Sequence, residues 1–153
     1  MSGTVVSIYI TPKAGEPMQN LAEVQAAPGR GLAGDRYYLK QGSYSDMPGG
    51  GRELTLIESE ALDYLETEKG IQLNPAAARR NILTRGVRLN DLVGKEFRVG
   101  GVRLRGVRLC DPCNYLEGKT QPGVLAGLVN RGGLRADILR EGMIRVGDIV
   151  DSE

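Results

Sequence analysis

The stretch EFRVGGVRLRGVRLCDPC, residues 96–113, decides the fold because it joins two strand-like patterns through a glycine pair and ends in Cys-x-x-Cys. Gly100 and Gly101 lie where a two-residue hairpin turn requires positive φ angles. Apolar and arginine side chains alternate over residues 102–106, and the alternation changes phase after Gly106, which is typical of a β-bulge. A bulge re-aims the side chains that follow it, so this hairpin is expected to set the direction of the two cysteines.

The rest of the chain repeats this pattern of short strands separated by turn residues. Its 22 glycines and seven prolines favour many turns, and no repeat or linker divides it. One helical segment ends at Gly70, one opens with Asn74 as N-cap before Pro75, and one begins at Pro122. We therefore predict a single domain over residues 1–153 that is mainly β, a β-barrel with a few short peripheral helices. The expected strands are 5–10, 22–26, 53–57, 96–99, 102–109, 134–139 and 149–150, the helices are 59–69, 74–78 and 122–130, and a turn is expected at 142–148.

Length and composition exclude several classes of protein. With 153 residues and a net charge of +1, the chain lacks the basicity of a nucleic-acid binder, and a single Phe without any Trp offers few platforms for stacking bases. No apolar run approaches the roughly 20 residues of a membrane-spanning helix, and the N-terminus has no signal-peptide pattern. We expect a cytoplasmic protein with reduced thiols and with neither nucleic-acid nor membrane partners.

Cys110 and Cys113 are the only cysteines, and the chain contains no histidine. Two thiols do not complete a four-ligand structural zinc site within one chain. Three interpretations remain: a dithiol redox pair, one nucleophilic or metal-ligating thiolate with a neighbour, or two incidental thiols. Residues 79–108 carry eight arginines and one lysine against Asp91 and Glu96. Such positive surroundings favour both a thiolate and an anionic ligand such as phosphate.

Three further segments have a functional and a structural interpretation. Loop 29–36 contains G-x-G-x-x-G, but a proline precedes it and no amphipathic helix follows, which excludes a dinucleotide-binding fingerprint. Its N–H groups could cradle an anion, or Asp35 could hold a purely structural turn. Residues 79–86 and 131–135 combine arginines with an amide, a hydroxyl or glycines, which suits a phosphate or an ordinary surface. Segment 53–68 has six acidic residues and no basic one, as in a solvated helix face or, alternatively, a partner-docking surface.

Eight short motifs follow one another along nearly the whole chain. They are VSIYI (6–10), GLAGDR (31–36), LIESEAL (56–62), RNILTRGVRL (80–89), LVGKEFRVG (92–100), LCDPCNYL (109–116), RGGLRA (131–136) and GMIRVGD (142–148). No single motif is specific, but the ordered set resembles the MOSC domain, a family named after the C-terminal domain of molybdenum cofactor sulfurase.

The resemblance implies a MOSC-like β-barrel and a role with the molybdenum cofactor, either binding molybdopterin or carrying persulfide sulfur. The family cysteine most resembles Cys113, in Pro-Cys-x-x-Leu, so Cys113 is the candidate metal ligand and catalytic thiol, and Cys110 is the second catalytic candidate. A thiolate suits both roles, and arginine forks suit the phosphate of a pterin. The expected cofactor-binding residues are Gly34, Asp35, Arg36, Arg79, Arg80, Asn81, Thr84, Arg131, Gly132, Gly133 and Arg135.

The same resemblance implies the partners. The chain is too short to include a pyridoxal-phosphate module, so no pyridoxal-phosphate site is expected, and sulfur would come from a separate donor such as a cysteine desulfurase. A redox partner would serve the family variant in which bound molybdenum reduces N-hydroxylated compounds. The alternatives are a non-catalytic module that binds or delivers the cofactor or another anionic small molecule, and a Cys-x-x-Cys dithiol redox protein.

Overall fold

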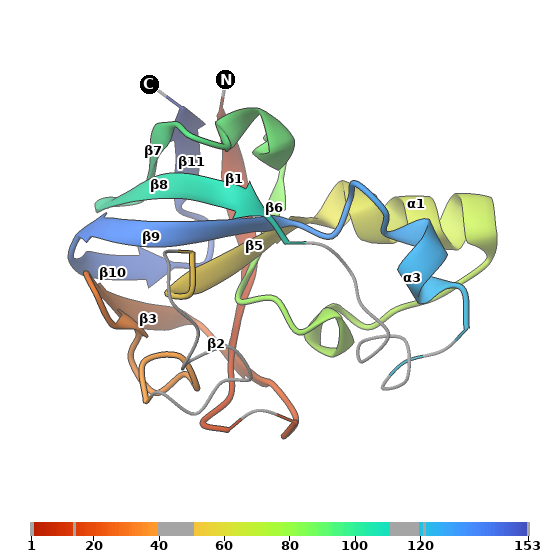
Figure 1. Cartoon of the computed structure of the whole chain (residues 1–153), viewed down its shortest axis with the longest axis horizontal. Helices are drawn as coiled ribbons and strands as arrows, with labels where there is room; N and C mark the ends of the chain where they lie inside the picture. The colour runs from red at the N-terminus through yellow and green to blue at the C-terminus, as the bar shows by residue number, and fades with distance from the viewer. Residues whose placement is uncertain (1, 14, 40–50, 111–119, 121, 153) are drawn as a thin grey trace.

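The computed structural model describes residues 2–13, 15–39, 51–110, 120 and 122–152. Its main sheet runs in the order β11-β7-β8-β9-β5-β6-β1 and closes on itself because β1 also pairs with β11. The predicted mainly β, barrel-like fold is therefore confirmed (Figure 1). The barrel strands are β1 (Ser2–Ile10), β5 (Leu54–Glu58), β6 (Ile82–Arg85), β7 (Glu96–Val99), β8 (Val102–Leu109), β9 (Leu134–Arg140) and β11 (Ile149–Ser152).

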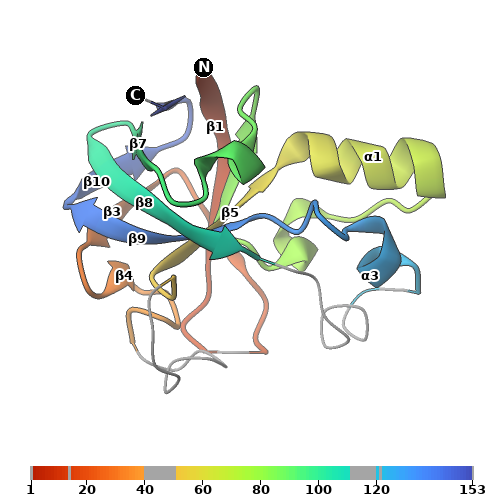
Figure 2. The same cartoon turned by 45° about the horizontal axis from the view of Figure 1, so that its top comes forward.

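The remaining elements surround the barrel. A second sheet has the order β10-β3-β4, and β2 extends the main sheet beyond β1. In both views α1 and α3 lie on one side of the barrel and the β3–β10 sheet lies on the other (Figure 1, Figure 2). These elements are β2 (Gln19–Leu21), β3 (Glu23–Ala27), β4 (Gly31–Leu32), β10 (Gly142–Arg145), α1 (Ser59–Lys69), α3 (Val124–Gly127), and the 3-10 helices η1 (Pro75–Ala78) and η2 (Leu89–Leu92).

Two apolar clusters hold these layers together. Inside the barrel, inward side chains such as Phe97 and its cross-strand partner Leu104 are fully buried. Outside it, Leu83 of β6 belongs to a second cluster with Leu65 of α1 and Leu128. Burying one such leucine contributes roughly 1.5–3 kcal/mol. The second cluster therefore fixes the helices against the outer face of the β1–β6–β5 part of the barrel.

The hairpin 96–109 forms as predicted, including its bulge. β7 pairs with β8 in antiparallel register, and the register of β8 with β9 shifts between Gly106 and Arg108, so that Val107 is the extra residue. A Cβ atom at position 106 would collide with the carbonyl oxygen of Leu92, because the next residue, Val93, pairs with Gly106 in a parallel bridge. The glycine is thus required by the close approach of two backbone segments.

Other expectations are confirmed or corrected. Helix 59–69 has the predicted bounds, and the Asn74 side chain accepts from the Ala76 N–H at 2.9 Å, although the helix it caps is 3-10. The helix expected over 122–130 is confined to Val124–Gly127. The turn expected over 142–148 is wrong for residues 142–145, which form β10 and pair with β3. Among the described residues, no helix is long and apolar enough to cross a membrane.

Candidate functional site

Arg80 joins three of the predicted segments at the end of the barrel where β8 stops and β9 starts. Its Nε donates to the carbonyl oxygen of Gly132 at 2.8 Å, and its Nη2 donates to that of Cys110 at 3.4 Å. The Cys110 N–H in turn donates to the carbonyl oxygen of Gly133 at 2.8 Å. We call the group formed by Arg79, Arg80, Cys110, Gly132 and Gly133 the arginine rim.

Gly133 makes this close arrangement possible. Its φ angle is +113°, and a Cβ atom there would collide with the carbonyl oxygen of Leu56 in β5. Only glycine fits both conditions without strain. The glycine pair before β9 therefore allows the backbone to lie against β5 while it accepts the hydrogen bond from Cys110.

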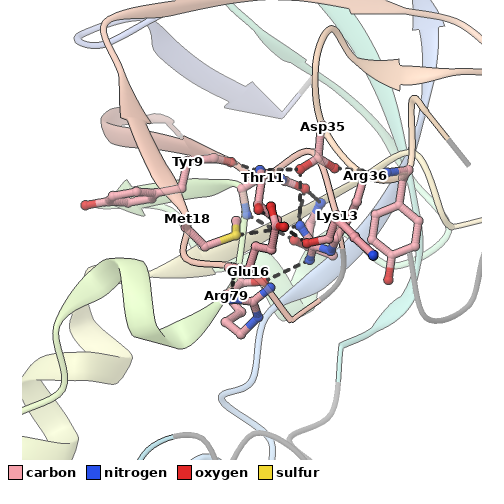
Figure 3. Close-up of polar contacts among 11 residues, drawn as sticks. Tyr9, Thr11, Lys13, Glu16, Met18, Asp35, Arg36 and Arg79 are labelled. Carbon is pink, nitrogen blue, oxygen red and sulfur yellow. Dashed lines mark hydrogen bonds and ion pairs between the residues drawn. The ribbon is translucent and has the colours of Figure 1, made fainter. Parts of the chain in front are cut away.

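Arg79 has an unusual backbone for an arginine. It ends η1 with φ 59° and ψ 33°, in the left-handed region, which costs a residue with a side chain roughly 1–2 kcal/mol. Its Nη1 donates to the carbonyl oxygen of Glu16 at 2.7 Å, and its own carbonyl accepts from Nη2 of Arg36 at 3.4 Å (Figure 3). Strained residues are concentrated at functional sites. This conformation is therefore a second reason, besides charge, to place a site here.

Asp35 and Arg36 form a buried ion pair next to the rim. Nη1 of Arg36 lies 3.1 Å from Oδ1 of Asp35, and the two side chains are 8% and 0% exposed. Oδ1 also accepts from the Thr11 N–H at 3.1 Å, and the Arg36 guanidinium lies over the Tyr37 ring. Figure 3 shows the carboxylate enclosed by these donors. The pair thus ties the loop to the end of β1, as in the structural interpretation of this segment.

Several N–H donors of loop 29–36 bond to acceptors within the protein. The N–H of Gly29 donates to Oε1 of Glu53 at 2.9 Å, and those of Ala33 and Asp35 donate to the carbonyl oxygens of Gln25 and Leu32. Gly34, another predicted contact, has φ +86°, and a Cβ atom there would lie 3.2 Å from Cδ1 of Ile10. These N–H groups therefore do not point toward a ligand.

Asn81 is also committed to the fold. Its Oδ1 accepts from the N–H and Oγ1 of Thr55 at 3.0 and 3.2 Å, and its Nδ2 donates to the carbonyl oxygen of Tyr9 at 3.0 Å. The side chain is fully buried, so it joins β1, β5 and β6 instead of presenting an amide to a heterocycle. We call Asp35, Arg36, Thr55 and Asn81 the buried layer.

Arg135, another predicted contact, lies on β9 between two neighbouring strands of the barrel. It lies opposite Thr55 of β5 and, on its other side, opposite Arg108 of β8. Arg108 was missed as a candidate, although the bulge after Gly106 was the signal that turns it outward.

Two predicted contacts lie away from the rim. Thr84 is buried within β6, and its Oγ1 donates to the carbonyl oxygen of Ile57 at 3.4 Å. The Arg131 guanidinium lies 3.8 Å from the centre of the Tyr64 ring of α1, and it lines a cavity of about 100 Å³ with Glu58 and Glu60. Both residues are therefore structural parts of the helix side of the molecule.

Of the two cysteines, only Cys110 is among the described residues. Cys110 is buried, with 1% exposure, at the end of β8. Cys113, the predicted metal ligand and catalytic thiol, lies outside the described residues. In the part of the chain that the structure describes, no three His, Cys, Asp or Glu side chains are grouped to hold a metal ion.

The pKa values of Glu53 and Glu96 are shifted from the ordinary value of a glutamate. Burial raises the pKa of Glu53, and nearby Asp137 raises it further, while the N–H groups of Ile138 and Gly29 oppose the shift. Hydrogen bonds from Arg105 and Arg103 lower the pKa of Glu96. Neither carboxylate belongs to the arginine rim, so these shifts describe the scaffold and not the candidate site.

The sequence and the fold lead to the same family. Residues 23–151 match the MOSC domain, so the chain belongs to the MOSC domain family, which is related to the molybdenum cofactor. No curated protein is similar enough to count as a match.

Solved structures share the fold. The YuaD protein from Bacillus subtilis has a TM-score of 0.82 at 18% identity, covering 100% of this chain and 97% of that one. YiiM from Geobacillus stearothermophilus has a TM-score of 0.73 at 18% identity, with coverages of 99% and 75%. YiiM from Escherichia coli has 0.69 at 19% identity, with coverages of 100% and 70%. At these identities the similarity establishes the fold alone.

The rim fits the anionic part of a molybdopterin-type cofactor. Half-buried Arg80 lies beside the point where the chain leaves β8, its neighbour Arg79 contacts the Glu16 carbonyl, and Arg135 with Arg108 adds charge on the adjoining outer face. Planar guanidinium groups bind phosphate through paired hydrogen bonds. Cys113, the metal ligand that the resemblance implies, follows three residues after Cys110, whose carbonyl Arg80 holds.

Proposed function

We propose that this protein binds the molybdenum cofactor or carries sulfur for it, with Cys113 as metal ligand or persulfide site. The observation that carries the proposal is the contact of Arg80 with the Cys110 carbonyl oxygen at 3.4 Å. It anchors the start of the Cys-Asp-Pro-Cys segment beside a group of arginines. Membership of the MOSC domain family supports the molybdenum cofactor as the ligand. The arginines of the rim carry the positive charge that an anionic ligand requires.

Different residues would bind the cofactor, position the binding segments and carry sulfur. Arg79, Arg80 and Arg135 would hold the phosphate of the pterin, and the buried layer would keep their segments in place. When bound, the cofactor would supply metal-centred redox chemistry or receive sulfur. As a sulfur carrier, the Cys113 thiolate would attack the outer sulfur of a donor persulfide, forming a new S–S bond while the donor cysteine leaves as its thiolate.

The proposal includes partners that the chain itself does not provide. Sulfur would come from a separate cytoplasmic donor such as a cysteine desulfurase, and no pyridoxal phosphate would bind here. Reduction of N-hydroxylated compounds at bound molybdenum would require an external electron donor. A module that only shelters or delivers the cofactor would need the rim but not turnover.

The test is metal analysis and intact mass of protein expressed in a cofactor-producing host. Stoichiometric molybdenum, or an added mass of about 32 Da for one sulfur atom, is expected for wild type and Cys110→Ala and absent from Cys113→Ala. Circular dichroism of each variant controls for folding. Wild type without either signal would contradict the proposal, and a mass two hydrogens lower would instead support the dithiol interpretation.

A further inference from the structure

A groove of about 640 Å³ lies along the side of α1 that borders β6. Leu62 of α1, Leu73 and Leu83 of β6 form its apolar part, together with Val6 of β1. Val6 is 39% exposed although it belongs to a barrel strand. None of the rim residues lines this groove, so it is a separate feature of the molecule.

One stripe of α1 faces the groove. Ser59, Leu62, Asp63 and Glu66 all line it, and their spacing of three and four residues places them on a single helix face. Asp63 and Glu66 bring negative charge to the wall. Arg85 of β6 lies 3.3 Å from Asp63, with side chains 55% and 58% exposed, so these two charges offset each other. Oε1 of Glu66 accepts from Nε2 of Gln72 at 3.1 Å, a neutral donor that leaves the charge of this carboxylate in place.

The groove is too open for a small molecule. Ligand pockets of this size commonly bury about 70–90% of a drug-sized compound. Here Asp63 and Arg85 in the wall are more than half exposed and Val6 is 39% exposed, so the groove is open to solvent along its length. A segment of another protein can cover such a surface with apolar side chains while its cations meet the acidic wall. The complementary segment is therefore basic and amphipathic.

We propose that this groove docks a lysine- or arginine-bearing amphipathic segment of a partner protein. Apolar side chains of the segment would contact Val6, Leu62 and Leu73, and its cations would contact Asp63 and Glu66. The charge of the lining supports this choice, because two carboxylates, Asp63 and Glu66, stand against one guanidinium, that of Arg85. Docking there would contact the start of η1, whose other end is Arg79.

The test is selection of a random 16-residue peptide display library on the purified wild-type protein. The enriched sequences are expected to combine lysine or arginine with leucine-like residues. A synthetic peptide of the selected sequence should bind Glu66→Lys about tenfold more weakly than wild type, and more weakly still at higher salt. Val6→Ser should weaken binding by about threefold through lost apolar contact.

Matched variants give the controls. Glu68→Lys reverses an exposed charge on α1 outside the groove, and Val146→Ser removes an exposed valine elsewhere, so both should stay within about twofold of wild type. Absence of enriched peptides, selection of acidic peptides, or equal loss in Glu68→Lys would overturn the proposal. Self-association that Glu66→Lys abolishes would assign the groove to a second copy and also overturn it. The peptide-binding assay does not involve molybdenum, so its outcome is independent of the proposed function.

Discussion

The buried layer and the arginine rim adjoin one another at one end of the barrel, but they use the same residue types differently. Arg36 is 8% exposed and its guanidinium is enclosed by Asp35, Met18 and the Arg79 carbonyl. Arg80 is half-buried and holds the carbonyl oxygens of Cys110 and Gly132. Arg36 is thus enclosed within the fold, whereas Arg80 stays partly accessible at the point where the predicted segments meet.

The largest effect is expected from breaking the buried ion pair. Asp35→Asn leaves the Arg36 charge without its counter-ion in a buried place, which costs about 3–5 kcal/mol of unfolding free energy. Urea denaturation measures it. The control is Asp151→Asn, whose exposed pairing with Arg98 at 3.9 Å should cost less than about 1 kcal/mol. Equal losses in the two variants would show that burial does not distinguish these pairs.

Asn81→Ala should be nearly as severe. It removes the partners of the Thr55 N–H and the Tyr9 carbonyl, and each buried group left unsatisfied costs about 1–3 kcal/mol. We expect a loss of about 2–4 kcal/mol in the same assay. Asn90→Ala, which removes one exposed hydrogen bond to Asn130, should change stability by under about 1 kcal/mol. A similar loss of unfolding free energy at both positions would show that the buried hydrogen bonds of Asn81 contribute no more to stability than an exposed one.

Arg80→Lys should affect the candidate site more than the fold. Lysine keeps the charge but lacks the planar fork, so contacts to Gly132 and Cys110 are lost at a cost of about 1–2 kcal/mol in unfolding free energy. Molybdenum or sulfur retention should fall much more. Arg131→Lys is the control, since Arg131 lies on Tyr64 away from the rim, and it should retain the cofactor. Equal retention of molybdenum or sulfur in both variants would show that Arg80 does not contribute to cofactor binding.

The smallest effect concerns pH and Glu53, which holds the Gly29 and Ile138 N–H groups beside the buried layer. Its pKa is raised above 4.5, so the folded state takes up its proton before the unfolded state does. This contribution stabilises the fold as pH falls toward 4.5. Glu96 has a lowered pKa and acts in the opposite direction, losing its stabilisation as pH falls below 4.5.

Glu53→Gln keeps an acceptor oxygen but no longer titrates. The variant should therefore lack the stability gain between neutral pH and about 4.5, as followed by urea midpoints across that range. Glu141→Gln, at an exposed position, should follow the wild-type curve. Parallel curves for wild type and Glu53→Gln would mean that this carboxylate does not contribute to the pH dependence.

Local patterns predicted much of the fold. The hairpin turn, the bulge after Gly106 and helix 59–69 each depend on neighbours close in sequence, through positive φ angles, alternation or a terminal glycine. β10 was not predicted, because its pairing with β3 joins residues more than a hundred positions apart. Long-range pairing leaves little trace in a short segment such as 142–145.

The motifs along the chain were enough to predict the family, the mainly β barrel and the coincidence of arginines with Cys110 and Cys113. Which of the predicted residues lie together could be seen only in the folded protein. It brought Arg80, Gly132 and Cys110 into contact, buried Asp35 and Asn81 within the fold, and placed Thr84 and Arg131 elsewhere. The physical reason is that motif spacing specifies residue types along the chain, whereas strand register and burial determine which polar groups must satisfy one another.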